Sequence, residues 1–341
     1  MKTNNLNFLR LIAAGLVLVG HSAIFWGRPE PFFLSWMPLG PLGVAIFFII
    51  SGYLISQSWQ QDPHLLRFFI RRCLRIFPGL IVCVLLCIFV LGPWLTSLPL
   101  KQYFAHEATW QYLRNLALYI TYYLPGVFEH NRVANAVNGS LWSLPLEFFL
   151  YIVVAFLGAI STKKWITITL FSTSVLLYVC WAQSVTEMLV VYGTDVRQLY
   201  INGSYFWAGA LFYQLDLKRY FSITSVVLAA VGLLCIQSRF PQYLFLAAWT
   251  LLPLIVLAFG LSTNQTLTRL TSTGDYSYGV YIYAFPIQQA IVFLYPDLDF
   301  GIYVALCTAV TLAFAILSWH VIEKTALAFK PRSPSLAGAI A

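Results

Sequence analysis

Long apolar runs separated by short polar stretches fill this chain. The runs recur near 8–26, 41–58, 77–95, 142–160, 166–183, 200–215, 222–236, 243–260, 276–295 and 301–319. A bilayer core about 30 Å thick needs roughly 20 apolar residues in each helix that crosses it. A transmembrane β-barrel would instead show short segments of alternating hydrophobicity. The pattern therefore predicts an all-α polytopic membrane protein with about ten transmembrane helices.

One further apolar run, 111–128, contains Arg114 and ends at Pro125 and Gly126. If this run stays outside the bilayer and the N-terminus is cytoplasmic, most of the 20 Lys and Arg residues lie inside, as the positive-inside rule requires. If the run spanned the membrane, every later loop would change sides, including the loops that hold Lys163, Lys164, Lys218 and Arg219. We therefore expect both termini to be cytoplasmic and one extra external or re-entrant helix near 111–128.

The long external segment 96–140 that this topology creates is polar and aromatic, whereas the other loops are short. Long ordered loops often bind ligands, so the segment is interpreted either as a binding element or as a cap over the helix ends. Its sequence does not decide between these two alternatives.

Composition narrows the function classes. The chain is 60% hydrophobic and 9% charged, whereas soluble domains are about 25% charged. The net charge of +8 fits basic cytoplasmic loops, so membrane lipids are expected around the protein and no nucleic acid is expected as a partner. The five His and six Cys residues show no zinc-binding spacing, so no metal site is predicted.

The first apolar run contains two ionisable residues, Arg10 and His21. Each is costly inside hydrocarbon, so each is a candidate functional residue. Their spacing returns to nearly the same helix face, with the two residues about 16 Å apart along the axis. One helix face therefore presents a cation near the cytoplasmic side and an imidazole deep in the membrane, which suits a reaction across the bilayer.

Glu147 is expected at the same depth as His21. Both residues lie about five positions, or roughly 7–8 Å, below the external ends of their runs. A carboxylate beside an imidazole stabilises the protonated form and makes His a better general base. The alternative is that Glu147 and His21 are two unrelated polar residues with separate partners.

Arg67, Arg71, Arg72 and Arg75 are three to four residues apart in RFFIRRCLRIFP, so several share one helix face. Guanidinium groups bind phosphates with two parallel hydrogen bonds, which suits a nucleotide or coenzyme A at the cytoplasmic mouth of a bundle. Topology anchoring and contact with anionic lipids are the alternative interpretation.

Small residues mark the run PLGVAIFFIISGYLIS. Gly43, Ser51 and Gly52 permit close approach between helices, and helix packing is their simpler interpretation. A lining for a narrow substrate arm is the alternative.

A proline interrupts the run DYSYGVYIYAFP. Pro286 leaves one backbone carbonyl free and kinks its helix. The nearby Tyr278 and Tyr281 are candidates to line a sugar or acyl cavity. Anchoring at the membrane interface is the alternative.

These segments, in this order, resemble the membrane-bound acyltransferase family 3, whose members O-acylate glycans. The resemblance covers roughly 4–325, is closest to members that act on O-antigen and exopolysaccharide, and rests on FLRLIAAGLVLVGHS, GPLGVAIFFIISGYLIS, RRCLRIFP, NGSLWSLPLEFFLY, DYSYGVYIYAFP and HVIEK. It implies a ten-helix core, taken here as a domain over 1–325, followed by a short cytoplasmic tail over 326–341.

The resemblance also implies a reaction and its residues. Members take an acyl group, usually acetyl, from cytoplasmic acetyl-CoA and pass it to a hydroxyl at the periplasmic side. His21 corresponds to the catalytic histidine, with Arg10 as its paired basic residue. The remaining matches are the donor-linked Arg-x-x-Arg motif and the WS-x-x-x-E motif, which comprise Arg72, Arg75, Trp142, Ser143 and Glu147.

We therefore expect an O-acetyltransferase in a bacterial inner membrane that modifies a cell-surface polysaccharide or its lipid-linked precursor. His21 and Glu147 are the expected catalytic residues, and acetyl-CoA is a substrate rather than a bound cofactor. Donor binding is assigned to Arg10, Arg71, Arg72 and Arg75, and the substrate path to Ser51, Gly52, Trp142, Ser143, Tyr278 and Tyr281. Polysaccharide-assembly proteins are expected as further partners.

The sequence departs from the family pattern at two positions, and two other functions are alternatives. Ala284 stands where many members have a histidine near the helix proline, and Thr325 replaces the proline of the C-terminal motif. Intramembrane Arg, His and Glu also suit proton coupling, so a glycan transporter or flippase is the main alternative. A non-enzymatic scaffold for polysaccharide assembly is the third class.

Overall fold

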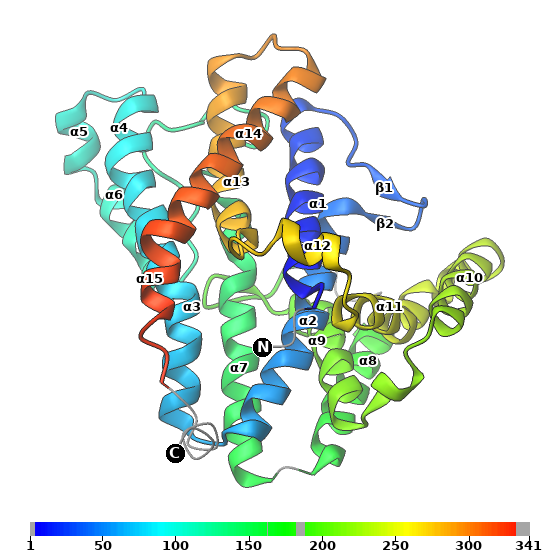
Figure 1. Cartoon of the computed structure of the whole chain (residues 1–341). Coiled ribbons are helices and arrows are strands. Elements are labelled where there is room, and N and C mark those ends of the chain that lie inside the picture. Colours follow the sequence, from blue (N-terminus) through cyan, green and yellow to red (C-terminus); the bar gives the residue numbers. More distant parts are fainter. Residues whose placement is uncertain (1–3, 162, 182–187, 332–341) are drawn as a thin grey trace.

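The computed structural model describes residues 4–161, 163–181 and 188–331. Within these residues a helix lies at every predicted span, which confirms an all-α architecture (Figure 1). The helices at those spans are α1 (Leu6–Trp26), α2 (Leu39–Gln61), α3 (Leu65–Leu86), α7 (Ser143–Ile160), α8 (Lys164–Trp181), α9 (Arg197–Gln214), α10 (Ile223–Arg239), α11 (Leu244–Leu261), α13 (Ser277–Leu294) and α14 (Phe300–Ser318).

Short elements extend or connect these helices. The π-helical segments are η1 (Cys87–Leu91), after α3, and η6 (Trp319–Glu323), after α14, and the 3₁₀ segment η3 (Gly139–Trp142) precedes α7. The remaining short helices are α4 (Gly92–Leu95), α5 (Leu100–Ala105), α6 (Glu107–Gln111), η2 (Tyr112–Ala117), η4 (Leu217–Tyr220), η5 (Pro241–Tyr243), α12 (Gln265–Leu270) and α15 (Lys324–Leu327). Two hairpins pair β1 (Phe32–Phe33) with β2 (Met37–Pro38) and β3 (Val190–Val191) with β4 (Thr194–Asp195). The predicted tail, 326–341, lies outside the described residues from 332 onward.

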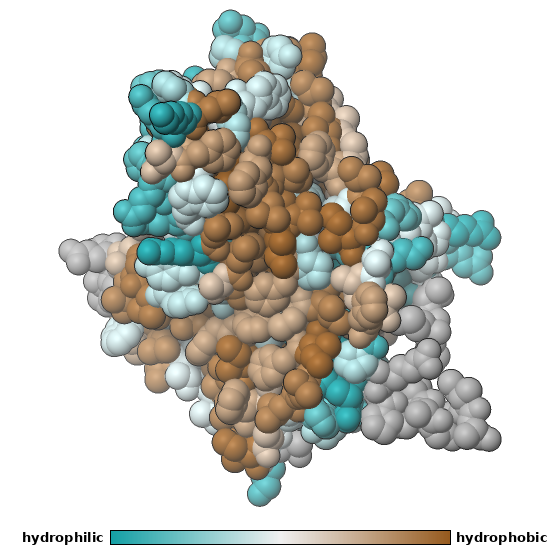
Figure 2. All heavy atoms as spheres, turned by 90° about the vertical axis from the view of Figure 1, so that its left-hand side faces the viewer, coloured by the Kyte–Doolittle hydropathy of each residue, from teal (hydrophilic) through white to brown (hydrophobic). Residues whose placement is uncertain are grey.

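Seven helices in the described part of the chain are long and apolar enough to cross a membrane. Figure 2 shows a broad apolar face over the middle of the molecule, with hydrophilic residues gathered toward its margins. Exposed side chains of this apolar kind on α3 and η1 include Ile81, Leu85, Phe89 and Val90. An exposed apolar surface of this size is unfavourable in water, so we place it in contact with lipid. The chain is a multi-pass membrane protein.

The run 111–128 does not form a spanning helix. Its first residues belong to the end of α6 and to η2, a 3₁₀ helix of six residues. Leu118 then adopts a left-handed conformation (φ 60°), and the chain continues without regular structure to Pro125 and Gly126. The extra helix expected near 111–128 is thus reduced to one short 3₁₀ segment. An irregular backbone needs partners other than lipid, and Asn115 supplies one by donating to the Thr121 carbonyl at 3.0 Å.

Glycine brings α2 close to its neighbours at the centre of the bundle. A Cβ atom on Gly52 would lie 2.7 Å from the carbonyl carbon of Phe206 on α9 and closer still to its oxygen. A Cβ atom on Gly43 would collide with the Ala13 carbonyl oxygen on α1. These contacts leave no room for any side chain, so helix packing accounts for both glycines.

Replacing Gly52 with alanine should therefore lower the free energy of unfolding by about 1–3 kcal/mol, because the new methyl group forces α2 and α9 apart. Gly15 offers a matched control, since apart from its own helix backbone no atom of the described residues lies within 4 Å of a Cβ built there. Gly15→Ala should be neutral or slightly stabilising, because alanine favours a helix over glycine. Thermal unfolding in detergent compares the two, and equal midpoints would contradict the close contact at Gly52.

Pro286 lies inside α13 and frees a carbonyl that anchors the end of the 96–140 segment. Pro286 has no N–H for the carbonyl four residues earlier, which belongs to Ile282. That carbonyl instead accepts hydrogen bonds from Asn138 Nδ2 at 2.8 Å and from Cys83 Sγ at 3.4 Å. The free carbonyl expected from the sequence thus links α13 to α3 and to the residue that precedes η3.

The side chain of Gln289, also on α13, anchors residues 131–136 of the same segment. Gln289 donates through Nε2 to the carbonyls of Val133 and Ala136 at 2.7 and 2.8 Å. Its Oε1 accepts a bond from Asn131 Nδ2 at 2.8 Å. These bonds make the end of the 96–140 segment an ordered cover over α13.

Candidate active site

A cavity of about 400 Å³ lies among α1, α2, α3, α7 and α13. Its walls hold most of the residues singled out from the sequence, namely Arg10, Ser51, Arg71, Arg72, Arg75, Ser143, Glu147, Tyr278 and Tyr281. This volume is in the range of cavities that bind small molecules and cofactors. Folding therefore unites motifs that are far apart along the chain in a single cavity.

Asp275, just before α13, joins two of the arginines. Its Oδ2 lies 2.6 Å from Arg75 Nη2 and 3.3 Å from Arg10 Nη1, while Ser277 Oγ donates to Oδ1 at 2.5 Å. Burial by itself would raise the pKa of Asp275, but the charges of Arg75 and Arg10 outweigh this effect and lower the pKa. Asp275 thus holds guanidinium groups from α3 and α1 together at the cavity wall.

A second buried carboxylate, Glu323 in η6, lies near the same place. Its Oε2 is 3.8 Å from Arg75 Nη1, and its Oε1 accepts a bond from Ser318 Oγ at 3.0 Å. Neither Asp275 nor Glu323 was predicted as a site residue, although each stands within a segment that carries the family resemblance. The available signal was an acidic residue in or beside an apolar run, which requires a partner.

Asp62, in the turn between α2 and α3, shares the charge of two more arginines. Arg67 Nη2 lies 2.5 Å from its Oδ1, and Arg71 Nη2 donates to its Oδ2. The hydrogen bond from Arg67, aided by Arg71, lowers the pKa of Asp62 in spite of its burial. Arg71 therefore reaches the cavity with part of its charge already neutralised, whereas Arg67 does not line the cavity.

Arg72 has a different environment from the neighbouring arginines. Its Nη2 donates to Ser58 Oγ at 3.3 Å, and its guanidinium carbon lies 5.5 Å from the centre of the Phe68 ring. Its Nε is buried without a hydrogen-bond partner, and among the described residues no carboxylate is within 4.0 Å of its guanidinium nitrogens. A buried guanidinium of this kind favours binding of an anion.

Glu147 lies farther along the same cavity. It accepts hydrogen bonds of 2.5 Å from Ser51 Oγ on α2 and from Tyr151 OH on α7. One turn closer to the start of α7, Ser143 Oγ and Tyr281 OH are 2.6 Å apart. Two hydroxyl groups thus bind the carboxylate and link α2 to α7, and the Ser143–Tyr281 pair links α7 to α13. Tyr151 was not predicted from the sequence, where it is one of several aromatic residues in its run.

His21 lies beyond the cavity, against two aromatic rings. Its ring centre is 5.3 Å from that of Phe285 and 6.0 Å from that of Phe25. Its Nδ1 is buried without a hydrogen-bond partner among the described residues. The partnership with Glu147 expected from equal depth is not formed, since Glu147 is bonded to Ser51 and Tyr151 instead.

One face of α13 connects the cavity wall to His21. Tyr281 lines the cavity, and Phe285, which contacts His21, lies one helical turn further on, about 6 Å along the axis. Gln288 continues this side of the helix and donates through Nε2 to Leu18 O and Ser22 Oγ on α1 at 2.7 and 2.6 Å. The Oε1 of Gln288 is buried and has no partner in the described part of the chain. Gln288 is thus a polar residue near His21 that sequence analysis missed, although its place in an apolar run was a signal.

Two predicted path residues, Gly52 and Trp142, do not line the cavity. Gly52 faces α9, as described above. Trp142 ends η3 and packs half-buried against the apolar core. Ser51 and Ser143, their neighbours in sequence, are the residues that reach the cavity.

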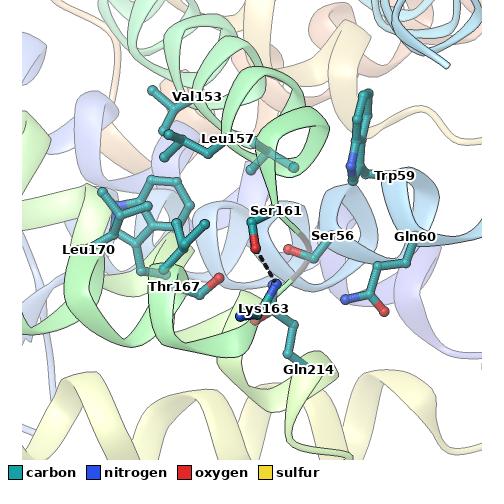
Figure 3. A pocket seen from close by; sticks show the side chains of 14 residues that line it. Ser56, Trp59, Gln60, Val153, Leu157, Ser161, Lys163, Thr167, Leu170 and Gln214 are labelled. Carbon is teal, nitrogen blue, oxygen red and sulfur yellow. Dashed lines mark hydrogen bonds between the residues drawn. The ribbon is translucent and has the colours of Figure 1, made fainter. Parts of the chain in front are cut away.

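A smaller cavity between α2, α7, α8 and α9 is shown in Figure 3. Polar side chains such as Ser56, Gln60 and Thr167 surround it, and the backbone N–H of Lys163 donates to Ser161 Oγ at 3.3 Å. Its volume of about 40 Å³ holds only a few water molecules, so it is too small for an acyl donor or a sugar.

Two known proteins are similar to this chain over almost its whole length. The chain is 33% identical to "O-acetyl transferase" of Shigella phage Sf6, which it matches over 95% of its own length and 96% of the relative's. It is 26% identical to "Nodulation protein 10" of Rhizobium leguminosarum bv. viciae over 95% of its own length and 93% of the relative's.

A third relative is similar to this chain over about half of its length. "Peptidoglycan O-acetyltransferase OatA" of Listeria monocytogenes is 26% identical over 48% of this chain and 28% of the relative. No solved structure matches. The model of a family described as an acyltransferase domain matches residues 3–320, and with the matches above it shows that this membrane protein belongs to the acyltransferase family.

Proposed function

We propose that this enzyme moves an acetyl group from cytoplasmic acetyl-CoA to a hydroxyl of a cell-surface polysaccharide, or of its lipid-linked precursor, at the periplasmic side of a bacterial inner membrane. The observation that carries the proposal is the cavity with its arginine cluster, together with the face of α13 that continues from this cavity to His21. Two relatives named as O-acetyltransferases support acetyl as the group and, for one of them, a glycan as the acceptor.

In this proposal the arginines bind the phosphates of the donor. Arg72 provides a guanidinium with no carboxylate partner among the described residues, and Arg10 and Arg75 are held beside it by Asp275. Planar guanidinium groups suit phosphate oxygens, whose negative charge offsets the cost of burying several cations in one place. The acyl arm then extends past Ser143 and Tyr281 toward His21.

His21 acts as general base in the transfer itself. Its imidazole takes the proton of the acceptor hydroxyl as the hydroxyl oxygen bonds to the thioester carbonyl carbon. The bond from that carbon to sulfur breaks, and the departing thiolate takes the proton from His21, so that the products are an O-acetyl ester and free coenzyme A. General-base catalysis of this type typically contributes 10²–10⁴-fold. The Glu147 carboxylate keeps the Ser51 and Tyr151 hydroxyls oriented in the cavity, and we assign it to positioning of the donor arm.

The test is acetyl-CoA-dependent acetylation by the purified protein, together with NMR of the host's surface polysaccharide. We expect free thiol to be released from acetyl-CoA when the acceptor glycan is present, and base-labile O-acetyl signals to disappear from cells that lack the gene. A transporter would change the location of the glycan and consume no acetyl-CoA. Full acetylation in the deletion strain would refute the proposed acceptor.

A further inference from the structure

The last described residues of the chain return to the arginine cavity. The helix α15 packs against α3, beside which it runs in Figure 1. Beyond α15, the carbonyl of Pro331 accepts a hydrogen bond from Arg71 Nε at 3.2 Å. Lys330, between α15 and this anchor, lines the same cavity as the donor arginines. The C-terminal segment therefore adds a cation to a site that the other helices build.

Lys330 has an unusual electrostatic environment for a lysine. The charged residues that line the cavity with it are Arg10, Arg71, Arg72, Arg75 and Glu147. Behind these arginines lie the carboxylates of Asp275, Glu323 and Asp62. The Lys330 side chain is exposed at the edge of the cavity. Its partial desolvation and the positive charges of Arg75, Arg72 and Arg10 lower its pKa to about 8, against the smaller opposing effect of Asp275. Since the carboxylates do not neutralise all these cations, the mouth of the cavity repels its own ammonium group and attracts an anion.

We infer that Lys330 is a donor-binding residue, whose ammonium group bonds to a phosphate oxygen at the mouth of the cavity. The inference rests on the proposed function for one point only, namely that the anion is part of acetyl-CoA. A phosphate placed among the arginines would offset the repulsion and favour the charged form of the lysine. The C-terminal segment then does more than end the last helix, because it completes the donor site.

This role predicts a particular dependence of binding on pH. Below pH 8 Lys330 is charged and contributes to binding, and above pH 8 it is increasingly neutral in the empty protein, so binding must include uptake of a proton. Affinity for the donor should therefore fall as the pH rises from 7 to 9. The arginines stay charged throughout this range and cannot produce the change. The carboxyl group of Glu323 beside Arg75 is present in every variant compared, so its effect on binding does not distinguish Lys330→Met from the unmodified protein.

The experiment compares Lys330→Met with Lys324→Met in the full-length protein in detergent. Lys324 is a matched control because, like Lys330, it is an exposed lysine in the same segment, whereas it does not line the cavity. Calorimetry with acetyl-CoA at pH 7 and 9, and with pyrophosphate at pH 7, measures affinity. We expect Lys330→Met to weaken binding of both probes about 10-fold at pH 7 and to remove most of the pH dependence. Lys324→Met should behave like the unmodified protein.

Each outcome has a separate meaning. Equal affinities and equal pH profiles for Lys330→Met and the unmodified protein would overturn the inference. If pyrophosphate binds in a Lys330-dependent manner but acetyl-CoA does not bind, the anion site stands and the proposed donor is wrong. If the unmodified protein binds neither probe, both the inference and the proposed donor are overturned.

Discussion

Replacement of His21 by alanine is expected to lower the rate of acetyl transfer by about 10²–10⁴-fold, because it removes the proposed general base. The fold should survive, since Nδ1 of His21 makes no hydrogen bond in the described structure and the ring touches only the Phe25 and Phe285 side chains among its aromatic neighbours. The KM for acetyl-CoA should stay the same, because His21 lies outside the cavity that holds the arginines. Initial rates of thiol release measure the effect in purified protein.

His320→Ala provides the matched control for His21. His320 is an exposed histidine in η6, bonded to Tyr276 OH at 3.3 Å, and it lines no part of the cavity. It should leave the rate unchanged. In cells that lack the native gene, the His21→Ala protein at normal membrane levels should fail to restore O-acetyl signals. A normal rate for purified His21→Ala would rule out the proposed base.

Replacement of Asp275 by alanine should cause the second large effect, a loss of about 3–5 kcal/mol in the free energy of unfolding. The change leaves Arg10 and Arg75 in the cavity wall without the carboxylate that both contact. Because the pKa of Asp275 is lowered in the folded protein, its contribution to stability is present at neutral pH. That contribution disappears only when the pH falls through this lowered value.

Unfolding in detergent measures this change, and a second readout separates positioning from stability. Asp275→Glu keeps the charge and should restore both stability and the KM for acetyl-CoA in part, whereas Asp275→Asn should raise this KM because the two arginines lose their common anchor. Asp297→Ala, at an exposed aspartate after α13, is the control and should change neither quantity. A stability equal to that of the control would show that the two ion pairs contribute nothing.

The sequence predicted the helices well because the bilayer imposes a simple rule on them. Each crossing needs about 20 apolar residues with every backbone group bonded inside the helix, so the spans can be recognised one at a time. The same rule, with the distribution of basic residues, correctly kept 111–128 from being assigned as a span. The free carbonyl before Pro286 was also predictable, since it follows from the covalent structure of proline.

The residues of the candidate site were predictable as a set because ionisable and small polar groups are rare inside apolar runs. Arg10, Arg72, Ser51 and Glu147 were identified in this way and by the family resemblance, and the structure places all four in one cavity. Whether they perform the proposed steps is decided by the experiments above. Gln288 and Asp275 carried the same type of signal and were missed.

The sequence by itself determined which segments are helices, where along each helix the polar residues lie and which residues share a face of one helix. Only the tertiary structure decided which of them meet. Arg75 is paired with an aspartate 200 residues away, and Glu147 is bonded to Ser51 rather than to His21, the partner expected from the sequence. The physical reason is that position along a helix sets the height of a residue in the membrane, whereas its partner depends on the rotation and the neighbours of the helix, which are set by packing against the other helices.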